Sequence, residues 1–231
     1  MIPSISAEQE RAGAVRWLSR SLPTVTGPNL GELGLFQRGW RDDFLGDLVR
    51  DEYEQRTEVA ARSSLVLQDG AHGGVLRLLT GNQVSDYARL MLGASSDLFD
   101  TLDPDNGFRL IGYWKLSSTA SILGDKFVNA PAWNFIHITA DTAIGANWML
   151  RTDNNSGVEV QTDSGVAFDT DQHWHQLYVE SGYAAHYLDG LLINSTTSKI
   201  PTVPMTADFR CLTRTTAVKY LDLDYWAVIP E

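Results

Sequence analysis

Cysteine is almost absent from this chain of 231 residues, since Cys211 is the single copy. A lone cysteine cannot form a disulfide within the chain. The run Phe209 to Thr213 (FRCLT) places it at an apolar strand position, where a free thiol usually packs as a small hydrophobe. Its sequence neighbours provide no clear activating environment for a nucleophile. We therefore expect Cys211 to lie in the core.

Long apolar runs and positive charge are also scarce. No apolar run approaches the ~20 residues of a membrane-spanning helix, and Met1–Ser6 lacks the features of a secretory signal. The 18 Lys and Arg residues are outnumbered by 29 Asp and Glu residues, which gives a net charge of -11. Such a surface repels phosphate backbones, so we expect neither nucleic acid nor a membrane as partner. We therefore expect the protein to work either in the cytosol or after release by cell lysis.

Helical signals are confined to residues 6–21. Ser6 and Gln9 form a capping box, and Arg16 and Arg20 lie near the C-terminal end, where cations are favoured. An apolar stripe at helical spacing predicts that this helix packs either on its own domain or on a neighbouring subunit. The stripe consists of Ala14, Val15, Trp17, Leu18 and Leu22.

Residues 22–39 combine frequent Gly and Pro with large apolar side chains. The Gly and Pro residues exclude a long regular element, whereas a flexible solvated linker would not carry so many apolar residues. We therefore expect an extended arm that lies on a surface, either its own or a partner's. Its apolar residues include Leu30, Leu33, Leu35 and Phe36.

The remainder reads as short strands separated by turn signals, with no second helix. Asp189-Gly190, between two β-prone runs, supplies the positive φ angles of a two-residue type I′ hairpin. This pattern predicts an all-β, antiparallel two-sheet jelly roll over residues 40–231, preceded by a helix and arm over residues 1–39. The main predicted strands are 64–68, 74–80, 87–92, 108–116, 121–128, 133–139, 146–152, 157–162, 174–180, 184–188, 191–195, 206–212 and 218–229.

Three segments carry a resemblance to a known family. The first is the opening run after Trp40. The second begins with a polar loop and continues with Trp174-His175, a strand and the turn at Asp189-Gly190. The third is the closing run Tyr220-Leu-Asp-Leu-Asp-Tyr. Together they resemble concanavalin A-like (laminin-G-like) jelly rolls of tailed bacteriophages, over residues 40–229. Tyr53 departs from the pattern, in which Trp is usual.

The resemblance implies a non-enzymatic virion protein, foremost a capsid decoration or cement protein assembled in the host cytoplasm. Its partner would be the major capsid protein or another virion protein, and a trimer is expected. The helix and arm would clamp the neighbouring subunits, and no cofactor is expected. The expected contact residues are Val15, Trp17, Leu18, Leu22, Leu30, Leu33, Leu35 and Phe36.

Enzymes with this fold provide a third hypothesis. Retaining glucanases need two carboxyl groups ~5–5.5 Å apart, placed on one strand face by a Glu-x-Asp-x-Glu type run that this chain lacks. Glu52, Glu54 and Glu58 match the spacing only in part and lie in a predicted loop. Related polysaccharide lyases use a Gln-x-His strand, but Phe135 stands two residues before His137 where Gln would be needed. The sequence therefore favours a protein without catalytic activity.

The sequence predicts no metal site either. His173 and His175 flank Trp174 and point to one side of a strand, but no third ligand can be named. The run Asp153 to Gly157 resembles a calcium loop, yet it lacks the continuation of an EF-hand and predicts a β-turn.

Sugar binding is the alternative function, as a lectin-like module of a tail fibre or of a bacterial protein. Aromatic rings beside Asp and Asn side chains are typical of lectin sites, and Trp114, Trp133, Trp148 and Tyr183 are candidates. Trp148 is preferred because it lies near Asn154 and the turn that contains it. Packing in the core is the competing interpretation for each ring.

Overall fold

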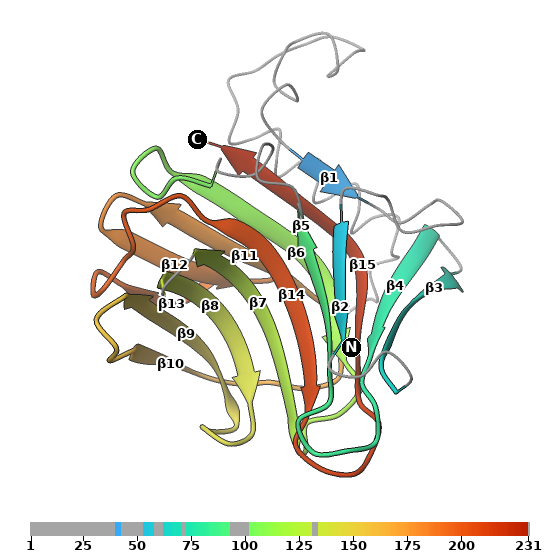
Figure 1. The fold of residues 1–231 in the computed structure, drawn as a ribbon. Coiled ribbons are helices and arrows are strands. Elements are labelled where there is room, and N and C mark those ends of the chain that lie inside the picture. Colours follow the sequence, from blue (N-terminus) through green and yellow to red (C-terminus); the bar gives the residue numbers. More distant parts are fainter. Residues whose placement is uncertain are drawn as a thin grey trace, which may run out of the picture.

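The computed structural model describes residues 40–42, 53–57, 62–70, 73–92, 102–130 and 134–230. These residues form fifteen strands arranged in two antiparallel sheets (Figure 1). None of the described segments is a helix with the length and apolarity needed to cross a membrane. The strands are β1 (Trp40–Asp42), β2 (Tyr53–Thr57), β3 (Ser64–Gly70), β4 (Gly73–Leu79), β5 (Tyr87–Leu92), β6 (Phe108–Leu116), β7 (Ile122–Ala130), β8 (Asn134–Asp141), β9 (Asn147–Asn154), β10 (Val160–Ala167), β11 (His173–Glu180), β12 (Tyr183–Leu188), β13 (Leu191–Thr196), β14 (Thr206–Thr213) and β15 (Tyr220–Pro230).

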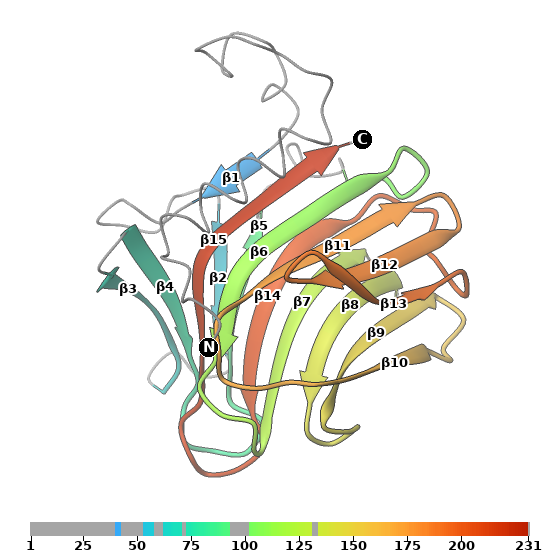
Figure 2. The ribbon, with the colours of Figure 1, turned by 180° about the vertical axis from the view of Figure 1, so that it is seen from behind.

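The two sheets stack face to face as curved layers, which Figures 1 and 2 show from opposite sides. The eight-stranded sheet has the order β13-β12-β11-β6-β15-β4-β3, with β1 paired to β15. The seven-stranded sheet has the order β10-β9-β8-β7-β14-β5-β2. The expected all-β, two-sheet architecture is confirmed. The closing strand β15 lies beside the opening strand β1, with Trp40 opposite Val228.

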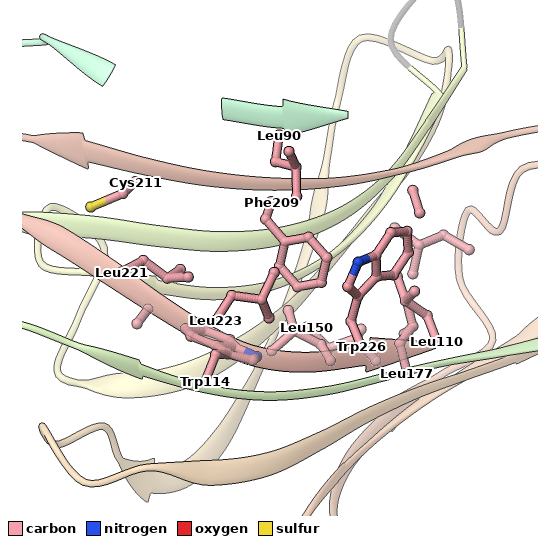
Figure 3. Close-up of a cluster of buried hydrophobic side chains, with 14 of the residues drawn as sticks. Leu90, Leu110, Trp114, Leu150, Leu177, Phe209, Cys211, Leu221, Leu223 and Trp226 are labelled. Carbon is pink, nitrogen blue, oxygen red and sulfur yellow. The ribbon is translucent and has the colours of Figure 1, made fainter. Parts of the chain in front are cut away.

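The core lies between the layers and is built from side chains that alternate along the strands, with the alternation shifted at the bulge between Leu223 and Tyr225 of β15. In β6, Phe108, Leu110 and Trp114 point inward and are fully buried. Side chains from β14 meet them from the other sheet, and Phe209 contacts Trp226 edge-on with ring centroids 5.4 Å apart (Figure 3). Each such side chain contributes roughly 1.5–3 kcal/mol when it leaves water.

Cys211 lies in this core with no exposed surface and no disulfide partner, which confirms the expectation for the thiol (Figure 3).

The predicted hairpin turn joins β12 to β13. Asp189 and Gly190 have φ angles of 49° and 83°, the two positive values that a type I′ turn requires. Leu188 pairs with Leu191 across the turn. The Asp-Gly signal was therefore sufficient to place this hairpin.

Substituting Gly190 with alanine tests the turn. A Cβ at Gly190 meets nothing within 4 Å, so the whole cost is conformational. At φ 83°, we expect Gly190→Ala to lower the free energy of unfolding by about 1 kcal/mol in urea titrations. Leu191→Ala, at a side chain that is 71% exposed, is the control and should be nearly neutral. Equal stability of the two variants would contradict the strained-turn argument.

The predictions for residues 1–39 lie outside the described part of the chain, whereas the loop predicted around Glu54 can be compared with the structure. The helix over residues 6–21, the arm over residues 22–39 and all eight expected capsid contacts lie outside the described residues. The loop predicted around Glu54 is wrong, because Tyr53–Thr57 forms the edge strand β2 and Glu54 pairs with Met91 of β5. Its sequence lacks the apolar alternation that marks a strand, and β2 is the last strand in the order of its sheet.

The turn predicted at Asp153 to Gly157 is present. Asn155 and Gly157 have φ angles of 66° and 73°. One carboxylate oxygen of Asp153 accepts hydrogen bonds from the backbone N–H and the hydroxyl of Ser156, at 2.9 Å each. Strand β10 begins after this turn, three residues later than predicted.

Candidate functional site

Polar and basic side chains gather on the outer face of the seven-stranded sheet, the face turned away from the core. We call the cluster formed by Arg89, His137, Thr139, Arg151 and Arg210 the arginine face. Register brings the group together, because His137 lies directly opposite Arg151 and Arg89 lies directly opposite Arg210. The chain neighbours that point inward and fix this orientation are Ala88, Leu90, Ile136, Ile138, Leu150, Phe209 and Cys211.

Arg89 and Arg151 are each paired with a carboxylate. Arg89 donates from Nε to Asp208 at 2.5 Å, and the Asp208 side chain is wholly buried. Arg151 forms an ion pair with Glu159, in which both side chains are largely shielded from water. Charged hydrogen bonds of this kind fix guanidinium groups in position. The ion pairs therefore hold the guanidinium groups of Arg89 and Arg151 in position on the arginine face.

His137 lies among these arginines and is neutral at pH 7. Burial lowers the pKa of its imidazole well below the usual value, and the charges of Arg151, Arg210 and Arg89 lower it further. Phe135 stacks on the ring with centroids 4.2 Å apart. A neutral imidazole offers one donor and one acceptor.

Thr139 adds an unusual buried hydroxyl to the same strand face. Its side chain has no exposed surface, and its Oγ1 has no hydrogen-bond partner. Its register neighbours are Met149 on β9 and Asp125 on β7. A buried hydroxyl without a partner costs about 1–3 kcal/mol and calls for an explanation. A bound polar ligand would provide the missing partner.

Two of the tryptophans expected to bind sugar, Trp114 and Trp148, are core residues. Trp114 and Trp148 are 0% and 2% exposed, and they contact each other edge-on with centroids 5.3 Å apart. Neither can offer a ring face to a sugar, because each occupies an inward position of its strand. Trp133 lies outside the described residues. Asn154 is exposed at the end of β9, and Tyr183 is half-buried at the start of β12.

The same core holds a histidine pair that the sequence did not reveal. His175 and His186 are buried, with Nδ1 of His175 3.2 Å from Nε2 of His186. His175 stacks on Trp114 at 4.3 Å and meets Trp148 edge-on at 4.6 Å. Within the described part of the chain, no three His, Cys, Asp or Glu side chains are grouped so as to hold a metal ion.

His173 lies at the edge of the sandwich between two carboxylates. Its Nδ1 donates to Asp189 at 2.6 Å, and its Nε2 donates to Asp169 at 3.0 Å. These bonds, that to Asp189 first, raise the pKa of His173 to about 9. The imidazolium therefore links the loop before β11 to the β12–β13 hairpin.

This shift predicts a pH-dependent contribution to stability. The folded pKa of about 9 lies above the usual 6.5, so the contribution is complete below pH 6.5 and is lost as the pH rises through 9. The carboxylates are 53% and 49% exposed, and solvent screening reduces the effect to about 1 kcal/mol. Urea unfolding at pH 6, 7.5 and 9.5 measures this effect. The free energy of unfolding of the wild type should exceed that of His173→Gln at pH 6, and the difference should shrink as the pH rises to 9.5. Parallel pH profiles would contradict the assignment.

Comparisons with known proteins agree on the fold. No family model matches the chain, and no curated protein matches its sequence. A prokaryotic β-1,3-1,4-glucanase from a mouse hindgut metagenome is 15% identical, with a TM-score of 0.61 over 84% of this chain and 99% of its own. A Shewanella oneidensis protein of unknown function is 11% identical, with a TM-score of 0.61 over 100% of this chain and 96% of its own.

A third match is the binding domain of botulinum neurotoxin DC in complex with rat synaptotagmin II. It is 9% identical, with a TM-score of 0.53 over 77% of this chain and 43% of that chain. These structures share the concanavalin A-like, two-sheet jelly roll with this chain, which confirms the fold expected from the sequence. Because glucanases and a toxin domain share the architecture, the fold alone does not decide the activity.

Proposed function

We propose that this chain is a non-enzymatic, lectin-like protein that binds a glycan on the arginine face. The observation that carries the proposal is the partnerless hydroxyl of Thr139, on the same sheet face as His137 and the ion-paired guanidinium groups of Arg89 and Arg151. Together these groups provide hydrogen-bond donors and one neutral hydrogen-bond acceptor. Because the ion pairs already restrain the arginine side chains, binding costs little side-chain entropy. Preorganised polar groups of this kind are typical of sites that recognise hydroxyl-rich ligands.

The carboxylates described on this face favour binding over hydrolysis. A retaining glycosidase needs one carboxyl group to act as acid and a second to attack the sugar. Here Asp208 is engaged by Arg89, and Glu159 is engaged by Arg151. A glycan-cleaving enzyme remains the third hypothesis, and release of reducing ends from β-glucans or of unsaturated products from alginate would establish it and overturn the proposal.

Thr139→Val provides a test with opposite expected effects on folding and binding. Removing a partnerless hydroxyl should leave stability unchanged or raised, whereas glycan binding should weaken about tenfold, the worth of one hydrogen bond at ~1.4 kcal/mol. Affinity for the strongest hit of a glycan array, together with thermal melting, measures both.

Thr152→Val is the matched control for that substitution. Thr152 is equally buried, but it faces the core and donates a hydrogen bond to the Ser198 carbonyl at 2.7 Å. This variant should lose about 1 kcal/mol of stability and keep its affinity for glycans. Unchanged binding in Thr139→Val, or an array without any hit, would contradict the lectin-like proposal.

Capsid decoration is the second candidate and is favoured by the apolar, turn-rich residues 22–39. In this proposal the helix and arm clamp neighbouring virion subunits, and the acidic sandwich faces outward as a trimer. Deleting residues 1–39 should abolish attachment to purified capsids while leaving a folded sandwich. Decoration by the truncated protein would contradict the clamp, and light scattering of the full chain would test the trimer.

A further inference from the structure

We infer that the outer face of the eight-stranded sheet holds a second sugar-binding surface, which takes a neutral oligosaccharide lying along β11. This surface lies on the opposite side of the sandwich from the arginine face. Its residues are different from those of the arginine face, so it goes beyond the proposed function. We call Trp174, Gln176 and Tyr178, together with Tyr187 beside them, the β11 strip.

Strand β11 presents three members of the strip as a line of outward side chains. His175 and Leu177 point into the core, so the side chains that alternate with them point away from it. Gln176 lies directly opposite Tyr187 on β12 and Ile111 on β6. These three strands lie side by side in the sheet (Figure 2). The amide of Gln176 is therefore surrounded by large apolar and aromatic side chains.

The amide of Gln176 is the feature that points to a ligand. The residue is only 6% exposed, and its Oε1 is buried without a hydrogen-bond partner. Burying an amide oxygen without a donor destabilises a fold and calls for an explanation. Rotation about the last side-chain bond, which has a broad torsional profile, can turn the oxygen toward a ligand. A hydroxyl group of that ligand would then provide the missing donor.

Two rings of the strip are held in place on either side of this amide. Trp174 stacks on Tyr113 with centroids 4.6 Å apart and meets Tyr225 edge-on at 5.7 Å. The hydroxyl of Tyr178 donates to Glu180 at 2.7 Å. Side chains restrained in this way lose little conformational entropy when a ligand binds.

The spacing of these groups suits an oligosaccharide rather than a single sugar. Trp174 and Tyr178 are four residues apart on β11, which corresponds to roughly 13 Å along a strand. Gln176 lies midway between them. A chain of sugar rings lying along β11 would therefore meet an aromatic ring, the amide and a second aromatic ring in turn.

The strip favours a ligand without charge. Its members are Trp, Gln and Tyr side chains, which are neutral at pH 7. Arg109 lies opposite Tyr178 with its guanidinium 5.4 Å from the ring centroid, so its charge is engaged in a cation–π contact. A neutral sugar offers apolar C–H groups to the aromatic rings and hydroxyl donors to the amide oxygen.

The surface around the strip is too small for a stable contact between two copies of this chain. It extends from Leu192 of β13 to Tyr225 of β15, across five neighbouring strands. Strand spacing makes it about 20 Å by 13 Å, or on the order of 250 Å². A stable interface buries ~800 Å² on each partner. A compact ligand therefore fits this surface better than a second copy.

The test is an array of neutral oligosaccharides, among them fragments of β-glucans, chitin and xylan, probed with the full-length protein. We expect binding that is nearly the same at about 50 and about 500 mM NaCl, because salt screens charges and the strip carries none. Affinities for the hits, measured by calorimetry, are then compared among variants.

Gln176→Leu removes the acceptor and keeps most of the side-chain volume. Because the oxygen has no partner in the fold, the melting temperature should be unchanged or raised, whereas binding should weaken about tenfold, the worth of one hydrogen bond. Trp174→Leu should weaken binding at least about tenfold, as loss of a central aromatic side chain does. Gln83→Leu, the same substitution at an exposed turn between β4 and β5, is the matched control and should bind as wild type does.

Thr139→Val separates this surface from the arginine face, because each hit is measured with both variants. Neutral hits that Gln176→Leu weakens and Thr139→Val does not would support the β11 strip. Neutral hits that only Thr139→Val weakens would overturn the second surface and leave the lectin-like function standing. An array without hits would overturn both. Light scattering that shows wild-type dimers, lost in Tyr187→Asp, would assign the strip to a second copy and overturn the sugar ligand.

Discussion

Replacing Trp114 with alanine is expected to lower the free energy of unfolding by about 3–5 kcal/mol. The indole lies in the core between the sheets (Figure 3) and has no exposed surface. It stacks on His175 at 4.3 Å and meets Trp148 edge-on at 5.3 Å. Removing it leaves a cavity between the sheets that the neighbouring rings can fill only in part. Guanidinium chloride unfolding followed by far-UV circular dichroism measures the loss.

Trp174→Ala provides the control for this prediction. Trp174 is the same residue type on the neighbouring strand of the same sheet, but it points outward and stacks on Tyr113 at 4.6 Å. Its ring is only half-buried, so we expect less than half of the loss in Trp114→Ala. Equal losses would show that the outer face of the eight-stranded sheet stabilises the fold as much as the core does.

Asp208→Ala is expected to cost about 3–5 kcal/mol, because it removes one partner of a buried ion pair. The carboxylate is wholly buried, while the Arg89 side chain is 24% exposed. Without this carboxylate, the positive charge of Arg89 lies beside that of Arg210 and is no longer neutralised by Asp208. Urea unfolding at low ionic strength measures this effect, since salt would screen part of the repulsion.

Two further variants keep that prediction testable. Asp163→Ala removes an exposed carboxylate that accepts a bond from Asn147 at 3.0 Å, and it should cost less than about 0.5 kcal/mol. Combining Asp208→Leu with Arg89→Met removes both charges and should recover part of the loss. A loss below 1 kcal/mol in Asp208→Ala, or no recovery in the double variant, would contradict the buried ion pair.

Most strands could be predicted because their signals are local. Asp189-Gly190 marks its own turn, and the alternation of His175 and Leu177 with Gln176 and Tyr178 marks β11 without reference to any other part of the chain. Strand β2 was missed for the same reason, since Tyr53–Thr57 has no apolar alternation. What makes it a strand is the neighbouring β5, which local sequence does not display.

The tryptophan predictions show a different limit. Alternation separates two faces of a strand, but it does not say which face meets the core. Tyr113 and Trp114 are adjacent large aromatics on β6, and the structure buries Trp114 between the sheets while Tyr113 packs under Trp174 on the outside. Only the arrangement of both sheets decides between them.

The arginine face required the strand order. Arg89, His137, Arg151 and Arg210 are spread over more than a hundred residues, and they meet because β14 lies between β7 and β5. Arg89, His137 and Arg210 each stand between two apolar neighbours, as Arg210 does between Phe209 and Cys211. A polar residue between two apolar ones indicates an outward position on a strand. The pattern could therefore have identified these residues, but it could not have shown that they lie together on one face of the sheet.

The placement of β14 and β15 has a consequence for biogenesis. Both strands come late in the chain, yet β14 joins β5 to β7 and β15 joins β4 to β6. Until the ribosome has delivered them, the earlier strands stand as separate fragments with open edges, which invite pairing between nascent chains. We expect slow, nearly all-or-none acquisition of structure at the end of translation, with a need for chaperones while the last quarter of the polypeptide is being made.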